Sequence, residues 1–394
     1  MWVGQCVTIS GATFVFPFLP LMVRAVGVHD LGAIALWSGA VITASQLGQA
    51  AVAPVWGRLA DRVGRKPMLI RAMLGASVTL MLTGFAPNIA ALFLLRMATG
   101  LLAGTGGATN ALVATSAPPD RVGHSLGVVQ SANYVGGIVG PGIGGVVVAT
   151  FGIRAGFFVS AALPLLAALL IASTVRENFV PRPRSQPRER IRHAVAAAGV
   201  GRMLATLILL AFLIQGIGTS LSPVLPLRLG MLVDASHVAV AIGAATMLQA
   251  LGATVAALNV SRLARVVGYR AVIAGGGVAA AVAFGLIGVA PTLAMMLVCS
   301  TAGGVAAGTL LPSINTLLGR TAPVAVRAEL FGYATSAMSL GGALLPLASS
   351  GLVSGFGARA PYLLVVVLYA GFAGWAWIRL SVSETEATFA LRNA

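Results

Sequence analysis

The sequence predicts an all-α polytopic membrane protein with twelve transmembrane helices in two pseudo-symmetric six-helix bundles. Hydrophobic residues make up 58% of the 394 residues and charged residues only 9%, whereas soluble domains carry about 25% charged residues. The apolar residues form continuous runs of the length needed to cross a bilayer, which is about 20 residues. The first half of the chain also repeats in the second half. The lipid bilayer is therefore the expected surrounding of this chain.

The apolar runs are separated by charged or turn-forming residues, and each run predicts one span. Transmembrane strands would need short alternating segments, and these runs are continuous. We expect the first span to be retained, because neither a charged leader nor a small-residue cleavage site is visible. The expected spans are residues 2–23, 33–56, 67–86, 89–116, 124–150, 154–175, 203–228, 237–260, 270–290, 293–318, 328–354 and 359–380.

The positive residues predict the orientation. Most of the 25 lysines and arginines follow the even-numbered spans or end the chain, and the opposite side holds only Arg24, Arg154, Arg228 and Arg359. Because positive loops face the cytoplasm, both termini are expected there. The net charge of +16 is thus dispersed among short loops, which argues against a nucleic-acid partner.

Matching segments in the two halves indicate a duplicated six-span unit. Pro17-Phe-Leu-Pro-Leu21 matches Pro223-Val-Leu-Pro-Leu227, and Pro141 in the fifth span matches Pro346 in the eleventh. Parallel repeats of this kind place a central site between two halves that rock around it. The predicted parts are an N-terminal bundle (1–175), a basic, proline-rich cytoplasmic linker (176–202), a C-terminal bundle (203–381) and a short cytoplasmic tail (382–394).

A charged, glycine-containing motif follows the second span, Gly57-Arg-Leu-Ala-Asp-Arg-Val-Gly-Arg-Lys-Pro-Met-Leu69. Its one acid, Asp61, can accept charge-assisted hydrogen bonds from neighbouring arginines and lock one conformation. The alternative is that the loop only sets orientation. The candidate gating residues are Gly57, Arg58, Asp61, Arg62, Gly64, Arg65, Lys66 and Arg121.

The fifth span carries two stripes of small residues. Gly136, Gly140 and Gly144 form one stripe, and Gly137, Pro141 and Gly145 form the other. Small residues let a neighbouring backbone come close, and a proline favours a kink. The stripes predict either a seal or rocking surface between the halves, or ordinary tight packing.

Arg96 is a basic residue placed clearly inside a span. A charge in the membrane interior is costly unless it is paired or hydrated, so it is a functional candidate. Backbone carbonyls and the polar side chains of Gln5, Thr8 or Gln130 are its expected partners.

These motifs resemble those of a known family. The loop over residues 57–69 closely resembles the signature loop of the major facilitator superfamily. Leu95-Arg96…Gly100…Gly104 is similar to its arginine motif, and Gly136–Gly145 to the glycine–proline motif of its antiporters. Trp37-Ser-Gly39, Trp56–Arg62 and Asn110–Thr115 are similar to multidrug efflux proteins among its twelve-span drug:proton antiporters.

The resemblance covers the whole chain and implies the major facilitator fold and a part for Arg96 in proton coupling. Many relatives carry an acid in the first span, but here every acid lies at a loop or a span end. The proton-binding group is therefore left open. Asp61 and the outer Asp30 are the carboxylate candidates beside Arg96.

Spans 1, 2, 4 and 5 and their repeats are expected to line a cavity. Amides can orient a ligand there, and aromatic and methionine side chains can adapt to apolar shapes. The candidates contain no acid, which favours neutral, amphipathic or anionic substrates over cationic ones. They are Phe14, Gln49, Asn110, Gln130, Asn133, Tyr134, Gln215, Met247, Gln249, Asn315 and Met338.

The leading functional prediction is proton-driven export of drugs or other amphipathic small molecules across the inner membrane of a bacterium, by alternating access. Export of a sugar or another metabolite by the same fold is the alternative, and a membrane sensor or enzyme is a remote one. An enzyme would need a catalytic cluster, which the sequence does not show. No metal or other cofactor is expected, since the proton gradient supplies the energy. A monomer is expected, because one chain contains both halves.

Overall fold

A computed structural model describes residues 1–102, 104, 109, 112–113, 122–175, 177, 199–323 and 326–392, without the side chains of 54, 58, 61, 122–124, 126, 327–329 and 381–392. Within these residues every regular element is helical and no strand occurs, which confirms the predicted all-α class. The elements are α1 (Trp2–Val15), η1 (Phe16–Phe18), α2 (Leu19–Ala25), α3 (Leu31–Val63), α4 (Arg65–Gly84), α5 (Ile89–Leu102), α7 (Val122–Thr174), α9 (Gly201–Ser220), α10 (Leu225–Leu229), α11 (Val238–Val289), α12 (Leu293–Gly308), α13 (Leu310–Thr321), α14 (Arg327–Phe356) and α15 (Ala360–Arg392).

The membrane-spanning capacity of these helices agrees with the predicted pattern of apolar runs. In the described part of the chain, nine helical segments are long and apolar enough to cross a membrane, and α5 is a shorter apolar helix. Two of the nine, within α7 and α11, have 48 and 52 residues, about twice what one crossing requires. Gly152 and Gly268 interrupt these two helices with non-helical dihedral angles. The count of twelve spans stays a prediction.

The repeat that is visible in the sequence recurs in the backbone. Gly64 and Gly268 have φ angles of 107° and 82°, and Gly152 and Gly357 have φ angles of 82° and 80°. Each pair occupies corresponding positions in the two halves. Positive φ values favour glycine, so the sequence repeats the residue that each turn needs.

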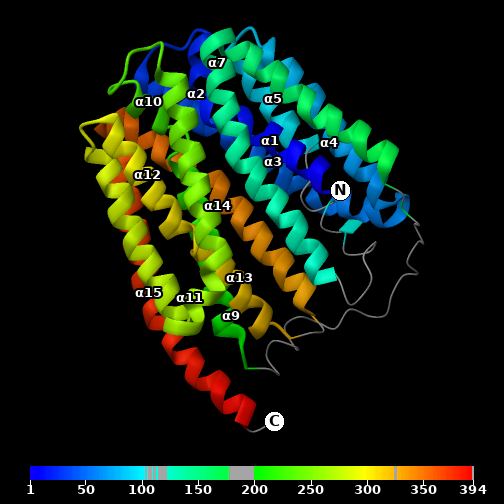
Figure 1. Cartoon of the computed structure of the whole chain (residues 1–394), viewed down its shortest axis with the longest axis vertical. Coiled ribbons are helices and arrows are strands. Elements are labelled where there is room, and N and C mark those ends of the chain that lie inside the picture. Colours follow the sequence, from blue (N-terminus) through cyan, green and yellow to red (C-terminus); the bar gives the residue numbers. More distant parts are fainter. Residues whose placement is uncertain are drawn as a thin grey trace.

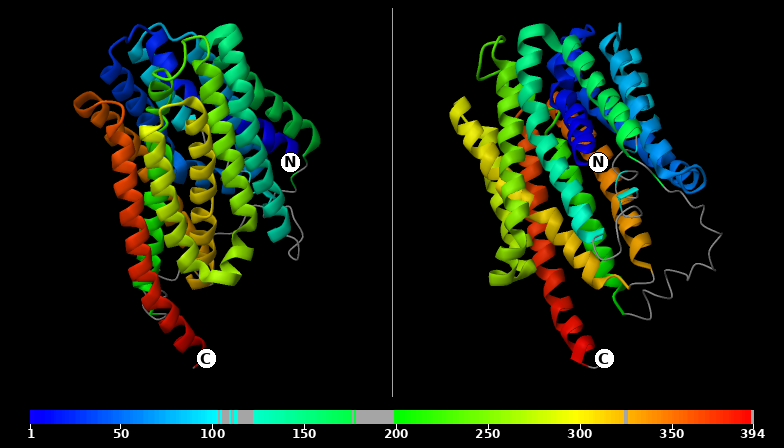
Figure 2. Two further views of the ribbon diagram at one scale, coloured as in Figure 1. Left: turned by 60° about the vertical axis from the view of Figure 1, so that its left-hand side comes forward. Right: turned by 45° about the vertical axis from the view of Figure 1, so that its right-hand side comes forward.

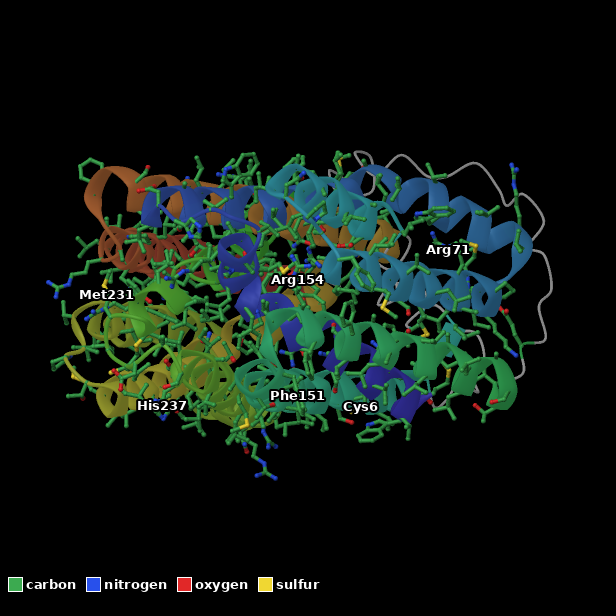
Figure 3. The ribbon with its side chains drawn as sticks, turned by 90° about the horizontal axis from the view of Figure 1, so that it is seen from above. Cys6, Arg71, Phe151, Arg154, Met231 and His237 are labelled. Atoms are coloured by element: carbon green, nitrogen blue, oxygen red, sulfur yellow. The ribbon has the colours of Figure 1, made fainter. Side chains whose placement is uncertain are left out.

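The two halves meet at one end of the molecule and diverge toward the other (Figures 1 and 2). The end that carries α2 and α10, at the top of Figure 1, is called the upper end here. The beginning of α9 and the end of α15 lie at the lower end. Figure 3 views the molecule from above, and in this view Met231 and His237 of the second half lie on the opposite side from Arg71 of the first.

Each half has its own buried core, and much of the outer surface is apolar. Phe157 and Leu92 belong to the core of the first half, and Phe284 and Tyr369 belong to that of the second. Many large apolar side chains point outward, including Val298 with 68% of its surface exposed. A water-facing surface avoids apolar patches of this extent, so this surface fits a lipid surrounding.

The predicted linker and tail differ in how much of them is described. Residues 176–202 lie outside the described residues except at 177 and 199–202, and α9 already begins at Gly201. The segment predicted as a tail, 382–394, continues α15 as far as Arg392. The last span and the described part of the tail therefore form one helix.

Candidate functional site

Glycines bring α7 of the first half against α11 of the second half. A Cβ atom placed on Gly145 would lie 3.0 Å from the Cα atom of Gly243 and 2.9 Å from the carbonyl oxygen of Ala239. A Cβ atom on Gly243 would lie 2.7 Å from the carbonyl oxygen of Pro141. Ordinary contacts of a Cβ atom begin at 3.4 Å. The absence of side chains is therefore what lets the two backbones touch.

A second contact joins α3 of the first half to α14 of the second half. A Cβ atom on Gly39 would lie 2.9 Å from the carbonyl oxygen of Pro346, and one on Gly32 would lie 3.1 Å from the Cβ atom of Ser354. The Thr43 hydroxyl donates a hydrogen bond to the backbone of α14. These contacts extend from the beginning of α3 to its middle.

The two contacts are related by the internal repeat. Gly39 and Gly243 occupy corresponding positions near the beginnings of α3 and α11, and each lies against a proline-bearing helix of the other half. At the upper end α10 also touches η1 and α2, and Phe18 packs in one core cluster with Leu225 and Leu229. We call this set of interactions the upper contacts. They join the halves at the upper end.

A cavity of about 250 Å³ lies between the halves and reaches into the second one. Most of its lining comes from α9, α10, α11, α12 and α15, and η1, α1 and α7 contribute five residues. Leu221 and Ser222 come from the turn between α9 and α10. None of the lining residues carries a charge. They are Thr13, Phe16, Pro17, Gly137, Pro141, Ile217, Gly218, Leu221, Ser222, Leu225, Thr246, Gln249, Ala250, Ala253, Phe284, Ile287, Ser300 and Tyr362.

Among the residues predicted to contact substrate, Gln249 lines this cavity. Phe14 is buried in the core of the first half, and Met338 packs against the core of the second. Met247 contacts Gly142 across the two halves. The others are placed elsewhere or lie outside the description.

Asn133 accepts a hydrogen bond of 2.8 Å from Gln5 and donates one of 3.1 Å to Gln130. Tyr134, Gln49, Gln215 and Asn315 are partly buried away from the lining, and Asn110 lies outside the described residues.

The two stripes of the fifth span contact different neighbours. Gly136, Gly140 and Gly144 lie against the backbone of α1, within the first half. Gly137 and Pro141 line the cavity, and Gly145 contacts the second half. One stripe therefore packs a bundle together, and the other faces the boundary between the halves.

Arg96 lies on α5 and is buried, with 7% of its surface exposed. Its Nε atom is shielded from solvent and has no hydrogen-bond partner in the described part of the chain. The amide of Gln5, one of the expected partners, is occupied: its oxygen accepts from Thr109 and its nitrogen donates to Asn133. Thr8 donates to the Gly4 carbonyl. The structure therefore pairs these side chains with other groups.

The charged loop between α3 and α4 receives an acid from elsewhere in the chain. The Glu177 carboxylate accepts hydrogen bonds from the backbone N–H groups of Arg65 (2.9 Å) and Lys66 (2.8 Å). These groups begin α4, where a negative charge is favourable. Lys66 also donates to the Ala172 carbonyl.

The other gating candidates are placed only in part. Gly64 forms the turn between α3 and α4, and Gly57 and Arg62 lie on α3. The Arg58 and Asp61 side chains and all of Arg121 lie outside the description.

Asp30 has a structural position at the upper end. Its carboxylate caps α3 by accepting a hydrogen bond of 2.7 Å from the N–H group of Ala33, and the residue is exposed. Among the residues that the structure describes, no three His, Cys, Asp or Glu side chains gather as metal ligands would.

The cavity contains residues that were not predicted from the sequence. Tyr362 belongs to the last span, which lies outside the set of spans expected to line the site. Phe16 and Pro17 lie in η1, the break between α1 and α2, and Thr13 lies in the last turn of α1. The proline motif at Pro17 could have indicated this part of the lining. Backbone that is not helical at membrane depth occurs where it is buried in protein or lines a cavity.

Comparison with known proteins supports the resemblance of the motifs. The family model described as "Major Facilitator Superfamily" matches residues 1–247 and 207–392. "Multidrug resistance protein MdtG" of Salmonella typhimurium is 30% identical over 381 residues, which cover 96% of this chain and 94% of the relative. The protein of the same name from Enterobacter lignolyticus is 30% identical over 391 residues, which cover 98% and 92%.

Solved structures share the fold at lower identity. A bacterial homologue of the lysosomal transporter Spinster, in an inward-facing and unoccupied conformation, has a TM-score of 0.74 at 17% identity, covering 96% of this chain and 95% of that one. A D-xylose-proton symporter has a TM-score of 0.78 at 16% identity, with the same coverage. The helical architecture, the family match and the full-length relatives agree: the chain belongs to the Major Facilitator Superfamily and is a multi-pass membrane transporter, not an enzyme.

Proposed function

We propose that the chain exports drugs or other amphipathic small molecules by alternating access, driven by antiport of protons. The observation that carries this proposal is the uncharged, largely apolar cavity between two halves that are joined at one end. Apolar cavities with a few polar groups suit amphipathic ligands. The multidrug resistance proteins among the relatives support the same substrate class.

The direction of access follows from the predicted orientation. The connections at the lower end, such as the one between α3 and α4, are rich in arginine and lysine, and such loops face the cytoplasm. The upper contacts then close the external side, and the cavity is accessible from the cytoplasm. Export requires these contacts to open. The inner membrane of a bacterium, cytoplasmic termini and a monomer complete the proposal.

Proton coupling is assigned to the first half. Arg96 is a buried cation without a described partner for its Nε atom, and a buried cation responds strongly to charge changes nearby. Asp61 and Asp30 are the carboxylate candidates of the proposal, and Asp30 has the weaker case because it caps a helix in an exposed position.

Purified protein in liposomes tests the proposal. An imposed pH gradient should drive transport of labelled amphipathic drugs, and dissipating the gradient should stop it. A transport rate that does not depend on the pH gradient would refute antiport. Transport of sugars alone would support the alternative of a sugar or metabolite exporter.

The loop motif has its own test. We expect Asp61→Asn to abolish transport while the protein stays in the membrane at normal levels, because an amide cannot hold the neighbouring arginines by charge. Normal export by a well-expressed variant would exclude Asp61 from gating and coupling.

A further inference from the structure

Arginines at the lower end of the molecule lie over aromatic rings. Within the described ranges, contacts of this kind occur only at this end, whereas Arg154 and Arg228 at the upper end donate hydrogen bonds to backbone carbonyl oxygens. Tryptophan and tyrosine rings are typical of a membrane–water interface, and a ring attracts the cation above it. The contacts join Arg71 to Trp56, Arg270 to Trp377, Arg320 to Tyr269 and Arg379 to Trp375.

One of these cations is held in place while part of it stays open. The guanidinium carbon of Arg270, on α11, lies 3.8 Å from the centre of the Trp377 ring, and Trp377 is 50% exposed on α15. The Arg270 Nε atom donates a hydrogen bond of 2.9 Å to the Trp377 carbonyl oxygen. The two terminal nitrogens, Nη1 and Nη2, donate no hydrogen bond to any described residue, and neither is shielded from solvent. Two fixed donors therefore face the surroundings.

A second pair lies on the other flank of α15. The guanidinium carbon of Arg379 lies 4.9 Å from the centre of the Trp375 ring. Arg379 is exposed, and Trp375 is 40% exposed. Two residues correspond to about 200° around a helix, so Trp375 and Trp377 point to different sides, with the exposed Ile378 between them. We call Arg270–Trp377 and Arg379–Trp375 the arginine–tryptophan pairs.

The level of these pairs in the membrane follows from α15. Its apolar segment is Ala360–Leu380, and both tryptophans lie near the lower end of that segment. Toward the middle of the segment the exposed side is apolar, with Val367 66% exposed. A phospholipid beside α15 would therefore have its acyl chains against this apolar surface and its phosphate at the level of the pairs.

The charge of the pairs favours anionic lipid. Each pair presents a cation, and by the predicted orientation the lower end lies in the cytoplasmic leaflet, whose anionic lipids attract arginine and lysine. The headgroup of a zwitterionic lipid brings a cation of its own toward the guanidinium group. The acids that follow in the sequence, Glu384 and Glu386, lie beyond the apolar segment, and their side chains are outside the described residues.

We infer that the arginine–tryptophan pairs form a docking surface for the phosphate groups of anionic phospholipids in the cytoplasmic leaflet. The guanidinium groups donate to the phosphate oxygens, and the tryptophan rings hold the guanidinium groups at the level of the headgroups. The surface faces the bilayer and not the cavity, so this inference is independent of the exported substrate and of proton coupling.

Photolabelling of the full-length protein in liposomes tests the inference. The vesicles contain phosphatidylglycerol and phosphatidylcholine in both leaflets, with a trace of either lipid bearing the same photoactivatable group, and mass spectrometry measures labelling of the lower end of α15. Phosphatidylglycerol should label wild-type protein more than phosphatidylcholine does. Arg270→Gln and Arg379→Gln should each lower this preference by about 5-fold, the effect of one cation near an anionic surface.

Arg359→Gln is the matched control. Arg359 is exposed just before the beginning of α15, at the upper end, so this variant loses the same charge on the opposite side of the membrane and should keep the preference of wild type at the lower end. Thermal unfolding shows which variants are folded. Arg379 forms no hydrogen bond with a described residue, so Arg379→Gln decides the matter if Arg270→Gln does not fold.

The outcomes separate a built surface from general attraction by positive charge. Equal labelling of wild-type protein by the two lipids, an unchanged preference in either folded arginine–tryptophan variant, or an equal loss in Arg359→Gln would overturn the inference. The expected labelling together with no gradient-driven drug transport would leave it standing and refute the proposed function.

Discussion

Adding one methyl group at Gly243 should open the upper end of the transporter. Its Cβ atom would lie 2.7 Å from the Pro141 carbonyl oxygen, which is 0.7 Å closer than the 3.4 Å at which ordinary contacts begin. The second neighbour, the Cα atom of Gly145, would lie at 2.9 Å. Both neighbours are backbone atoms of the other half, so a change of rotamer cannot relieve the clash. The halves must separate.

The magnitude follows from the cost of overpacking. Inserting a methyl group into a well-packed contact costs about 1–3 kcal/mol. This cost falls only on the conformation in which the upper contacts are made, whereas the gain in helix propensity from glycine to alanine is common to both conformations. Gly243→Ala should therefore multiply the ratio of upper-open to upper-closed molecules by about 5 to 150.

Spin labels at two exposed positions of the upper end can measure this ratio. Phe151 and Met231 lie on different halves and are 75% and 54% exposed, and both are visible in Figure 3. Pulsed dipolar spectroscopy of labels at these sites, in a variant without the two native cysteines, resolves the two distances. In Gly243→Ala the longer distance should gain population.

The matched control is Gly371→Ala, on α15, where an added Cβ atom would meet nothing within 4 Å. This variant should leave the distance distribution unchanged. An unchanged distribution in a folded Gly243→Ala protein would refute the reasoning, and so would an equal change in the control.

Two further predictions concern the same contacts and the loop at the lower end. Gly32→Cys combined with Ser354→Cys should form a disulfide on mild oxidation, because the two Cβ atoms would lie 3.1 Å apart, and the cross-link should stop transport until it is reduced. A cross-link of Gly277→Cys with Ala373→Cys, whose Cβ atoms would lie 3.0 Å apart within one half, should leave transport intact; equal inhibition by both pairs would contradict rocking of rigid halves. Glu177→Gln should lower stability by about 1 kcal/mol, because a charged acceptor at the beginning of α4 is lost, and an unchanged thermal unfolding midpoint would contradict that role.

The backbone was the most predictable part of this protein. Continuous apolar runs and the residues that end them depend only on local sequence and on the thickness of the bilayer. The prolines of the first and seventh spans and the glycines at the turns recur in both halves. The pattern in one half therefore supports the interpretation of the same pattern in the other half. Gly152 and Gly357 end up with nearly the same φ angle for this reason.

The partners of polar side chains were less predictable. Sequence distance does not show which of several amides a buried cation can reach. In the structure the amide of Gln5, an expected partner of Arg96, forms hydrogen bonds with Thr109 and Asn133. The role of Glu177 was also hidden, because its contact with Arg65 joins positions that are distant in the sequence. The cavity lining depends on how the helices rotate and where the halves meet, and neither follows from the pattern of apolar residues.

The duplicated halves place different chemistry at equivalent positions. Arg96 on α5 corresponds to Ser300 on α12, since each lies four residues before a tightly packed glycine. Gly100 packs against Ser45 of α3, and Gly304 packs against Gln249 of α11. Ser300 lines the cavity, whereas Arg96 does not. A cation in that wall would be desolvated beside apolar ligands at a cost of several kcal/mol. The second half can form most of an uncharged cavity because Ser300 stands where the first half carries the buried Arg96. Under the proposed antiport, a change of protonation near Arg96 would then act on the first half without placing a charge in the cavity wall at the position of Ser300.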